Sequence, residues 1–137
     1  MPSPDQKSTR SFLLTARLFA LATVVVIVAL FGTAGALVQA GELKDVHGGA
    51  AIVLHVVTGG LMVALAGLAY DRKRAWWTVA LAFVIFAYSF VQAALGEGAT
   101  LGIHVPGSLL IVVGTIWLTV WLFSSASAGN RAAPTKT

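Results

Sequence analysis

Hydrophobic residues gather into four long runs that are separated by short polar breaks. None of the runs contains an Asp, Glu, Lys or Arg residue, and they cover residues 18–40, 46–70, 75–95 and 101–123. Each run reaches the about 20 apolar residues that a helix needs to cross the hydrocarbon core of a bilayer. The strict alternation of a membrane β-strand is absent. The pattern therefore predicts an all-α membrane protein, built as an up-down-up-down bundle of four transmembrane helices.

Polar segments mark the expected boundaries of this transmembrane domain. Residues 1–17 and 124–137 are predicted to be tails, and Asp45 is expected to cap the second helix. The first run exceeds the about 7–15 apolar residues of a signal peptide, so we expect a retained helix. Small residues four apart predict close approaches between helix backbones, at Gly32 with Ala36 and at Gly60 with Ala64.

The charged residues predict the orientation of the bundle. One side carries Lys7, Arg10, Arg17, Arg72, Lys73, Arg74, Arg131 and Lys136. The other side carries Lys44 alone among the basic residues, together with Glu42, Asp45 and Glu97. By the positive-inside rule, both tails and the central hairpin are cytoplasmic. The short loops and the absence of cysteine fit a multi-pass protein of a bacterial plasma membrane.

Composition narrows the partners and the chemistry. The chain has 137 residues, of which 58% are hydrophobic and only 10% charged, whereas soluble domains are about a quarter charged. The lipid bilayer is therefore the expected partner. The net charge of +4 comes from residues that flank the apolar runs, so nucleic acid is not expected to bind. The lack of cysteine excludes thiolate metal sites and covalently attached haem.

Three histidines lie inside or at the edge of the predicted spans, which contain no Asp, Glu, Lys or Arg. His47 and His55 belong to the second run and His104 to the fourth. Ionisable residues inside a membrane are costly and mark functional sites. The second and fourth helices run in the same direction, so imidazoles at similar depth can hold a flat b-type haem between them. For any single histidine, a structural packing role is the plain alternative.

A short internal repeat favours one pair of ligands. Val38-Gln39-Ala40 precedes His47, and Val91-Gln92-Ala93 precedes His104. We therefore predict His47 and His104 as the iron ligands, with His55 as the alternative. Gln92 is predicted to hydrogen-bond a ligand or a histidine, and Lys44 to pair with a haem propionate.

The same residues carry a family resemblance. From His47 through Gln92-Ala93-Ala94-Leu95-Gly96 to His104-Val105-Pro106, the chain resembles one four-helix half of the haem A synthase family. It also resembles small uncharacterised four-helix bacterial membrane proteins with the same histidine placement. The resemblance implies haem-ligating histidines on the second and fourth helices. The chain has one half, where the family has two, and it lacks the cysteine pair of many members, so the resemblance supports haem binding more than haem A synthesis.

Three functions follow as expectations. The first is an integral membrane protein that binds haem b for electron transfer or haem handling. The alternative is a cofactor-free accessory subunit or assembly factor of a larger membrane complex, such as a respiratory complex, and a homodimer would rebuild an eight-helix arrangement. A small transporter, or a quinone or ion site, is the third. No nucleophile–base–acid triad, phosphate loop or carboxylate dyad occurs, so an enzyme is not expected.

Overall fold

Helices make up almost all of the protein in the computed structural model, which describes residues 4–96 and 98–130. Glu97, Arg131 and Lys136, which entered the charge prediction, lie outside the described residues. Four helices are each long and apolar enough to cross a membrane. This confirms the all-helical part of the prediction. The elements are α1 (Pro4–Ala40), α2 (Lys44–Arg72), α3 (Trp76–Ala94), the short 3₁₀ helix η1 (Gly98–Thr100) and α4 (Leu101–Asn130).

Two of the helices are much longer than the apolar runs that predicted them. α1 begins at Pro4 and not near residue 18, and α4 continues to Asn130. Proline suits the first turn of a helix, because its missing N–H has no partner there anyway. The polar residues that follow are compatible with a helix outside lipid. Hydropathy therefore marks the part of each helix that can cross a membrane, and not the ends of the helix.

The connection between α1 and α2 differs from its predicted form. Leu43 is the N-cap of α2, with φ of 62°, and it makes no side-chain capping bond. The prediction that Asp45 caps this helix is wrong. Asp45 lies in the first turn, where its carboxylate is stabilised by the positive end of the helix dipole. The backbone N–H of His47 donates to Leu43 O at 2.8 Å and closes the first turn.

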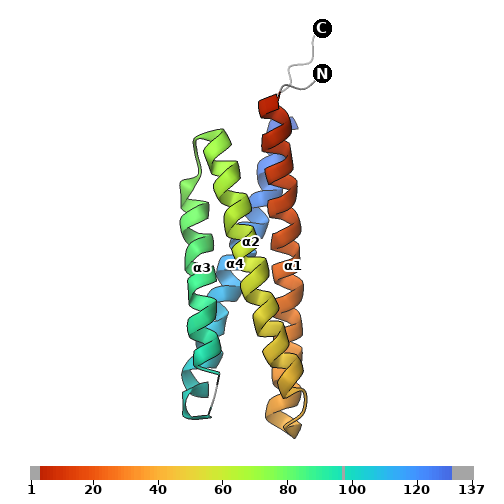
Figure 1. Ribbon diagram of the computed structural model, residues 1–137, viewed down its shortest axis with the longest axis vertical. Helices are drawn as coiled ribbons and strands as arrows, with labels where there is room; N and C mark the ends of the chain where they lie inside the picture. The colour runs from red at the N-terminus through yellow and green to blue at the C-terminus, as the bar shows by residue number, and fades with distance from the viewer. Residues whose placement is uncertain (1–3, 97, 131–137) are drawn as a thin grey trace.

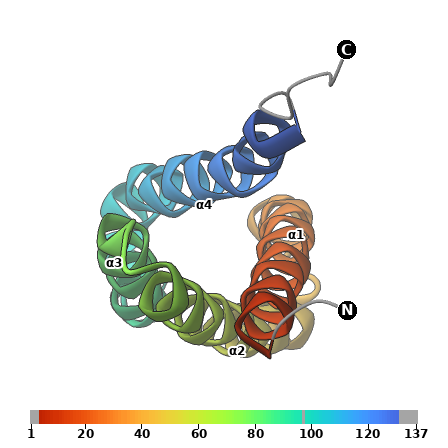
Figure 2. The ribbon, with the colours of Figure 1, turned by 90° about the horizontal axis from the view of Figure 1, so that it is seen from above.

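The four helices form a ring in which each helix packs on its neighbours in sequence, and α4 returns to α1 (Figures 1 and 2). The first residues of α1, the last residues of α4 and the α2–α3 connection lie at one end of the bundle, here called the terminal end. The α1–α2 and α3–α4 connections lie at the opposite end, here called the far end. Among the described residues, no Cα atoms of the diagonal pair α2 and α4 come within 8 Å of each other.

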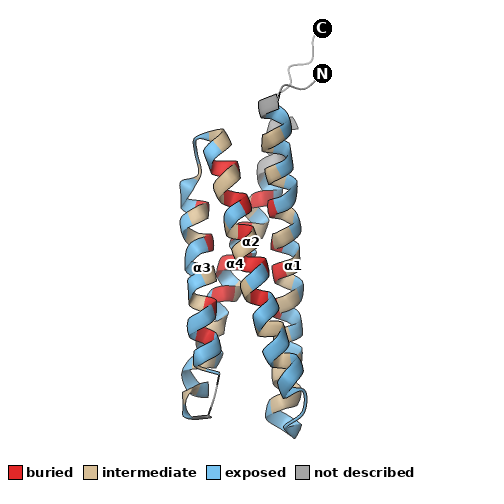
Figure 3. Ribbon diagram, viewed as in Figure 1, coloured by how far each residue is buried: buried red, intermediate tan, exposed pale blue. Residues whose placement is uncertain are grey.

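The buried core does not extend along the whole bundle. Within the described residues, nothing after Ile27 in α1, before Leu54 in α2 or before Ile111 in α4 is buried. Figure 3 shows the buried residues in the middle and toward the terminal end, with exposed residues at the far end. On α3, the two buried residues nearest the far end are both polar, Ser89 and Gln92. The far end is therefore held together without a filled apolar core.

Contacts between α1 and the other helices fix the terminal half. A Cβ atom added to Gly60 or Gly67 of α2 would collide with the rings of Phe19 and Phe12 of α1. Glycine at both positions thus lets the two helices approach closely. Arg17 of α1 donates to Leu122 O of α4 from Nη2 at 2.9 Å and from Nε at 3.2 Å. This basic side chain ties the first helix to the last.

Candidate functional site

His104 lies in the first turn of α4, and its ring contacts the end of α3. Its Nδ1 is 2.8 Å from the backbone oxygen of Gln92. A carbonyl oxygen can only accept, so Nδ1 must carry the proton and donate it. In the neutral ring, Nε2 then keeps its lone pair. The Gln92 oxygen belongs to the last turn of α3 and also accepts the backbone N–H of Leu95 at 3.1 Å, so His104 is its second donor.

His55 of α2 is held in a similar way and also bonds to α3. Its Nδ1 is 2.8 Å from the hydroxyl oxygen of Ser89 on α3. The same hydroxyl lies 2.6 Å from Phe86 O, and when its single proton goes to that oxygen it accepts from Nδ1 of His55. The ring also stacks on Phe90, with centroids 4.0 Å apart. In that tautomer of the neutral ring, Nε2 of His55 has a free lone pair.

His47 is held by the other side of the bundle. Its Nδ1 lies 3.0 Å from the hydroxyl of Thr33 on α1. The single Thr33 proton can also go to Ala29 O at 2.9 Å or to Leu30 O at 3.1 Å, and Thr33 then accepts from the histidine. The carbonyl partner thus assigns the tautomer of His104, and the hydroxyl partners of His55 and His47 are compatible with the same tautomer, in which Nδ1 carries the proton and Nε2 the lone pair. Metal-ligating histidines characteristically donate their second nitrogen in this way.

The positions of the partners show which histidines approach each other. Ser89 and Gln92 are three residues apart on α3, which corresponds to about 4.5 Å along the helix axis. His55 and His104 therefore reach α3 at neighbouring turns. His47 precedes His55 by eight residues, or about 12 Å along α2, and its bond is to α1. The geometry brings His55 and His104 together against α3, and these two residues are here called the histidine wall. His47 lies nearer the far end.

The other predicted site residues are less directly involved. Gln92 does bond His104, but through its backbone oxygen. Its side chain is only 4% exposed, and neither amide atom finds a hydrogen-bond partner among the described residues. Lys44 is exposed and is the first residue of α2. It lies one turn before His47.

Sequence reasoning missed the residues that orient the rings. Ser89 and Thr33 hydrogen-bond Nδ1 of His55 and of His47. Hydroxyl residues at matching depth on the neighbouring helices were the available signal. Serine and threonine are common in such helices, however, so the signal alone selects neither of them. Tyr88 was also passed over, although its hydroxyl lies beside the Gln92 amide at Gly107.

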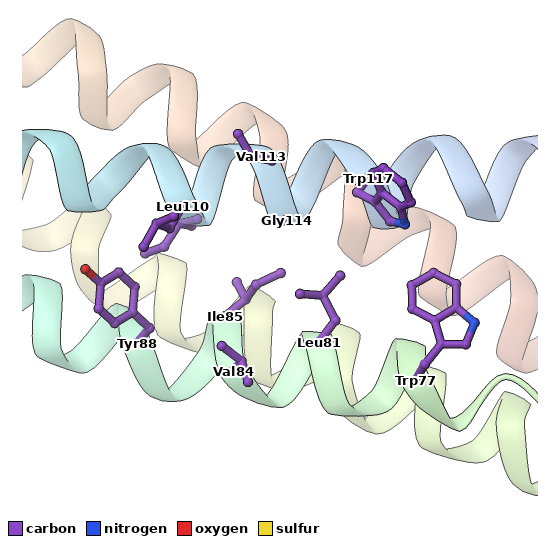
Figure 4. Close-up of a pocket in the computed structure, with 10 residues that line it drawn as sticks. Trp77, Leu81, Val84, Ile85, Tyr88, Leu110, Val113, Gly114 and Trp117 are labelled. Carbon is purple, nitrogen blue, oxygen red and sulfur yellow. The ribbon is translucent and has the colours of Figure 1, made fainter.

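An apolar groove separates the histidine wall from the terminal end. It lies between α3 and α4, has a volume of about 510 Å³, and is drawn in Figure 4. None of the described side chains that line it is charged. Trp77 and Trp117 lie at one end and Tyr88 at the other. The groove does not include any of the three histidines.

Compared with protein-family models, curated proteins and solved structures, the chain matches none. The resemblance to the haem A synthase family therefore rests on the residues quoted above. Among the described residues, no group of three or more His, Asp or Glu side chains is placed to enclose a metal ion. A haem iron can be held by only two imidazoles, so the absence of a three-residue group does not decide whether the histidines bind haem.

Proposed function

We propose that this protein binds a b-type haem between α2 and α4, for electron transfer or haem handling in a membrane. His104 would be one of the two histidines that hold it. His55 is the second ligand that the geometry favours, and His47 is the alternative. The observation that carries the proposal is that a neighbouring helix holds each of the three rings through Nδ1, because this arrangement leaves each Nε2 available to a metal.

The hydrogen bonds also direct the ligating atoms. The two nitrogens of an imidazole lie on opposite sides of the ring. With Nδ1 of both His55 and His104 turned to α3, each Nε2 is turned away from that helix. Donation from Nδ1 raises the basicity of Nε2 and fixes the ring orientation, which strengthens binding to iron. Ser89 and the Gln92 backbone oxygen therefore act as positioning groups.

The far end of the bundle offers a place for a flat group. α2 and α4 are diagonal, with no approach of their Cα atoms within 8 Å in the described ranges. A macrocycle ligated from both faces requires ligand helices that stand apart in this way. One turn after His104, Ser108 is a small residue, whereas the side chains of Tyr88 and Gln92 fill the space at Gly107. The donor set and the missing apolar core both fit a haem, which when bound would supply a one-electron carrier.

The first test is an absorbance spectrum of the protein purified in detergent after expression with added haem. We expect a Soret band that sharpens on reduction, with split α and β bands. Colourless protein under these conditions would refute the proposal. The cofactor-free accessory subunit would then be the better function, and co-purification of a larger membrane complex would support it.

Two variants distinguish the candidate ligands of α2. Ser89→Ala removes the hydrogen-bond partner of His55, and Thr33→Val removes the hydrogen-bond partner of His47. Loss of such a partner typically costs about 10–100-fold in metal affinity. We expect Ser89→Ala to weaken haem binding by at least about tenfold and Thr33→Val to change it less than threefold, measured by haem titration. The reverse order would assign the ligand to His47.

We further propose the membrane arrangement that the charges indicate: an up-down-up-down bundle with the terminal end in the cytoplasm of a bacterial cell. Lys73 and Arg74 lie at that end, and Lys44 lies at the far end. The chain has no cysteine, so single cysteines report their side cleanly. We expect Leu43→Cys to react with a membrane-impermeant maleimide on intact cells and Lys73→Cys to react only after lysis. The opposite labelling would invert the orientation.

A further inference from the structure

The groove between α3 and α4 has the dimensions of a ligand site. Its volume of about 510 Å³ falls within the roughly 300–1,000 Å³ of small-molecule pockets. Leu81 and Ile85 of α3 and Leu110 of α4 line its length (Figure 4). From Tyr88 to Trp77 it follows α3 for about 16 Å. The groove is thus long, narrow and apolar, which suits a molecule with a hydrocarbon chain.

The Tyr88 hydroxyl marks one end of the groove, and the Gln92 amide lies next to it, outside the residues that line the groove. A Cβ atom added to Gly107 would lie 2.6 Å from the hydroxyl oxygen of Tyr88 and would collide with Nε2 of Gln92. The two groups therefore converge on the same point of α4. The Gln92 side chain is 96% buried, and its amide has no hydrogen-bond partner within the part of the chain that the structure describes. A buried amide left unpaired is costly, so it calls for a partner.

The chemistry of these groups defines that partner. The amide N–H and the phenol O–H both donate, which selects an acceptor oxygen. No charged side chain among the described residues lines the groove, so the ligand must be neutral, and a phosphate or carboxylate headgroup would find no counter-charge. A quinone combines ring carbonyl oxygens with an apolar tail.

We propose that the α3–α4 groove binds an isoprenoid quinone, with a ring carbonyl at Tyr88 and Gln92 and the tail directed toward Trp77 and Trp117. This site does not depend on the proposed haem. The two sites share Gln92, however, because its backbone oxygen holds His104 while its side chain serves the groove. A bound quinone ring would therefore lie beside the histidine wall.

The test uses the full chain, purified without haem in detergent, and decylubiquinone as the probe. Binding is measured by equilibrium dialysis and by quenching of tryptophan fluorescence, since Trp77 and Trp117 line the groove. Decylbenzene, which has the same tail and no carbonyl, is the control ligand. We expect saturable binding of the quinone and at least about tenfold weaker binding of decylbenzene. Equal binding of the two would overturn the proposal and indicate a groove that only accommodates acyl chains.

Matched variants locate the binding. Tyr88→Phe and Gln92→Leu are each expected to weaken quinone binding several-fold, and together by about tenfold or more. Tyr70→Phe and Gln39→Leu, at exposed positions outside the groove, should leave it unchanged. Leu110→Trp fills the groove and should abolish binding, whereas Val63→Trp, at a position equally exposed on α2 (62% against 65%), should not. Wild-type affinity in both Tyr88→Phe and Leu110→Trp would overturn the proposal, even if Gln92→Leu fails to fold.

Discussion

Replacing His104 with alanine is expected to lower haem affinity by at least about a hundredfold. His104 is the histidine common to every ligand pair considered, and its ring is fixed through Nδ1 to the Gln92 backbone oxygen. Losing a ligand itself should cost more than the about 10–100-fold that loss of a ligand's hydrogen-bond partner costs. The measurement is a titration of the purified variant with haem, followed at the Soret band.

Two controls separate ligation from folding in this experiment. Ser108→Ala, one turn further along α4, removes a hydroxyl whose proton already goes to Val105 O at 2.7 Å, and it should leave haem binding intact. Adding free imidazole to His104→Ala should restore part of the Soret band, because the small molecule can occupy the vacated ligand position. Unchanged affinity in His104→Ala would exclude this residue as a ligand.

Replacing Gly60 with valine is expected to destabilise the bundle by about 1–3 kcal/mol, the usual cost of overpacking. Any Cβ at this position collides with the Phe19 ring, so α1 and α2 must separate or the ring must leave its place. Gly48→Val is the matched control, because it makes the same change on the same helix where nothing lies within 4 Å. Thermal or denaturant unfolding in detergent measures both variants.

A double variant sharpens the test at Gly60. Phe19→Ala removes the ring that blocks the new side chain, so combining it with Gly60→Val should cost less than the sum of the two single changes. Additive losses would mean that Phe19 is not the obstacle. Equal stability of Gly60→Val and Gly48→Val would mean that the close approach of α1 and α2 contributes nothing to the fold.

The same small-residue pattern had different outcomes at two places, which shows where sequence reasoning stops. Gly60 and Ala64 pack as predicted, with Ala64 only 3% exposed and Gly60 against Phe19. Gly32 has nothing within 4 Å, and the close approach predicted there is wrong. The difference lies in the neighbouring helix. The Phe19 ring of α1 lies against Gly60, whereas no neighbouring side chain lies against Gly32. A pattern on one helix cannot contain that information.

Hydropathy identified the four helices because lipid requires long apolar runs whatever the packing. It did not identify the extent of α1 or the capping of α2 by Leu43, since both depend on local backbone geometry. The histidines were found because ionisable residues are rare in such helices. Their partners were not, because the choice of Ser89 and Thr33 depends on how each helix is rotated. The preference for His47 remains a prediction that the Ser89 and Thr33 variants test.

The uneven core also determines how the bundle can move. Buried side chains join all four helices in the terminal half, so separating them there requires disruption of most of the packing. At the far end, α1, α2 and α4 contribute no buried side chains among the described residues, and opening there disrupts little. Local fluctuations follow the density of buried contacts. The α1–α2 and α3–α4 hairpins should therefore open and close about a hinge in the terminal half. This motion would admit a bulky ligand at the far end without unfolding the chain.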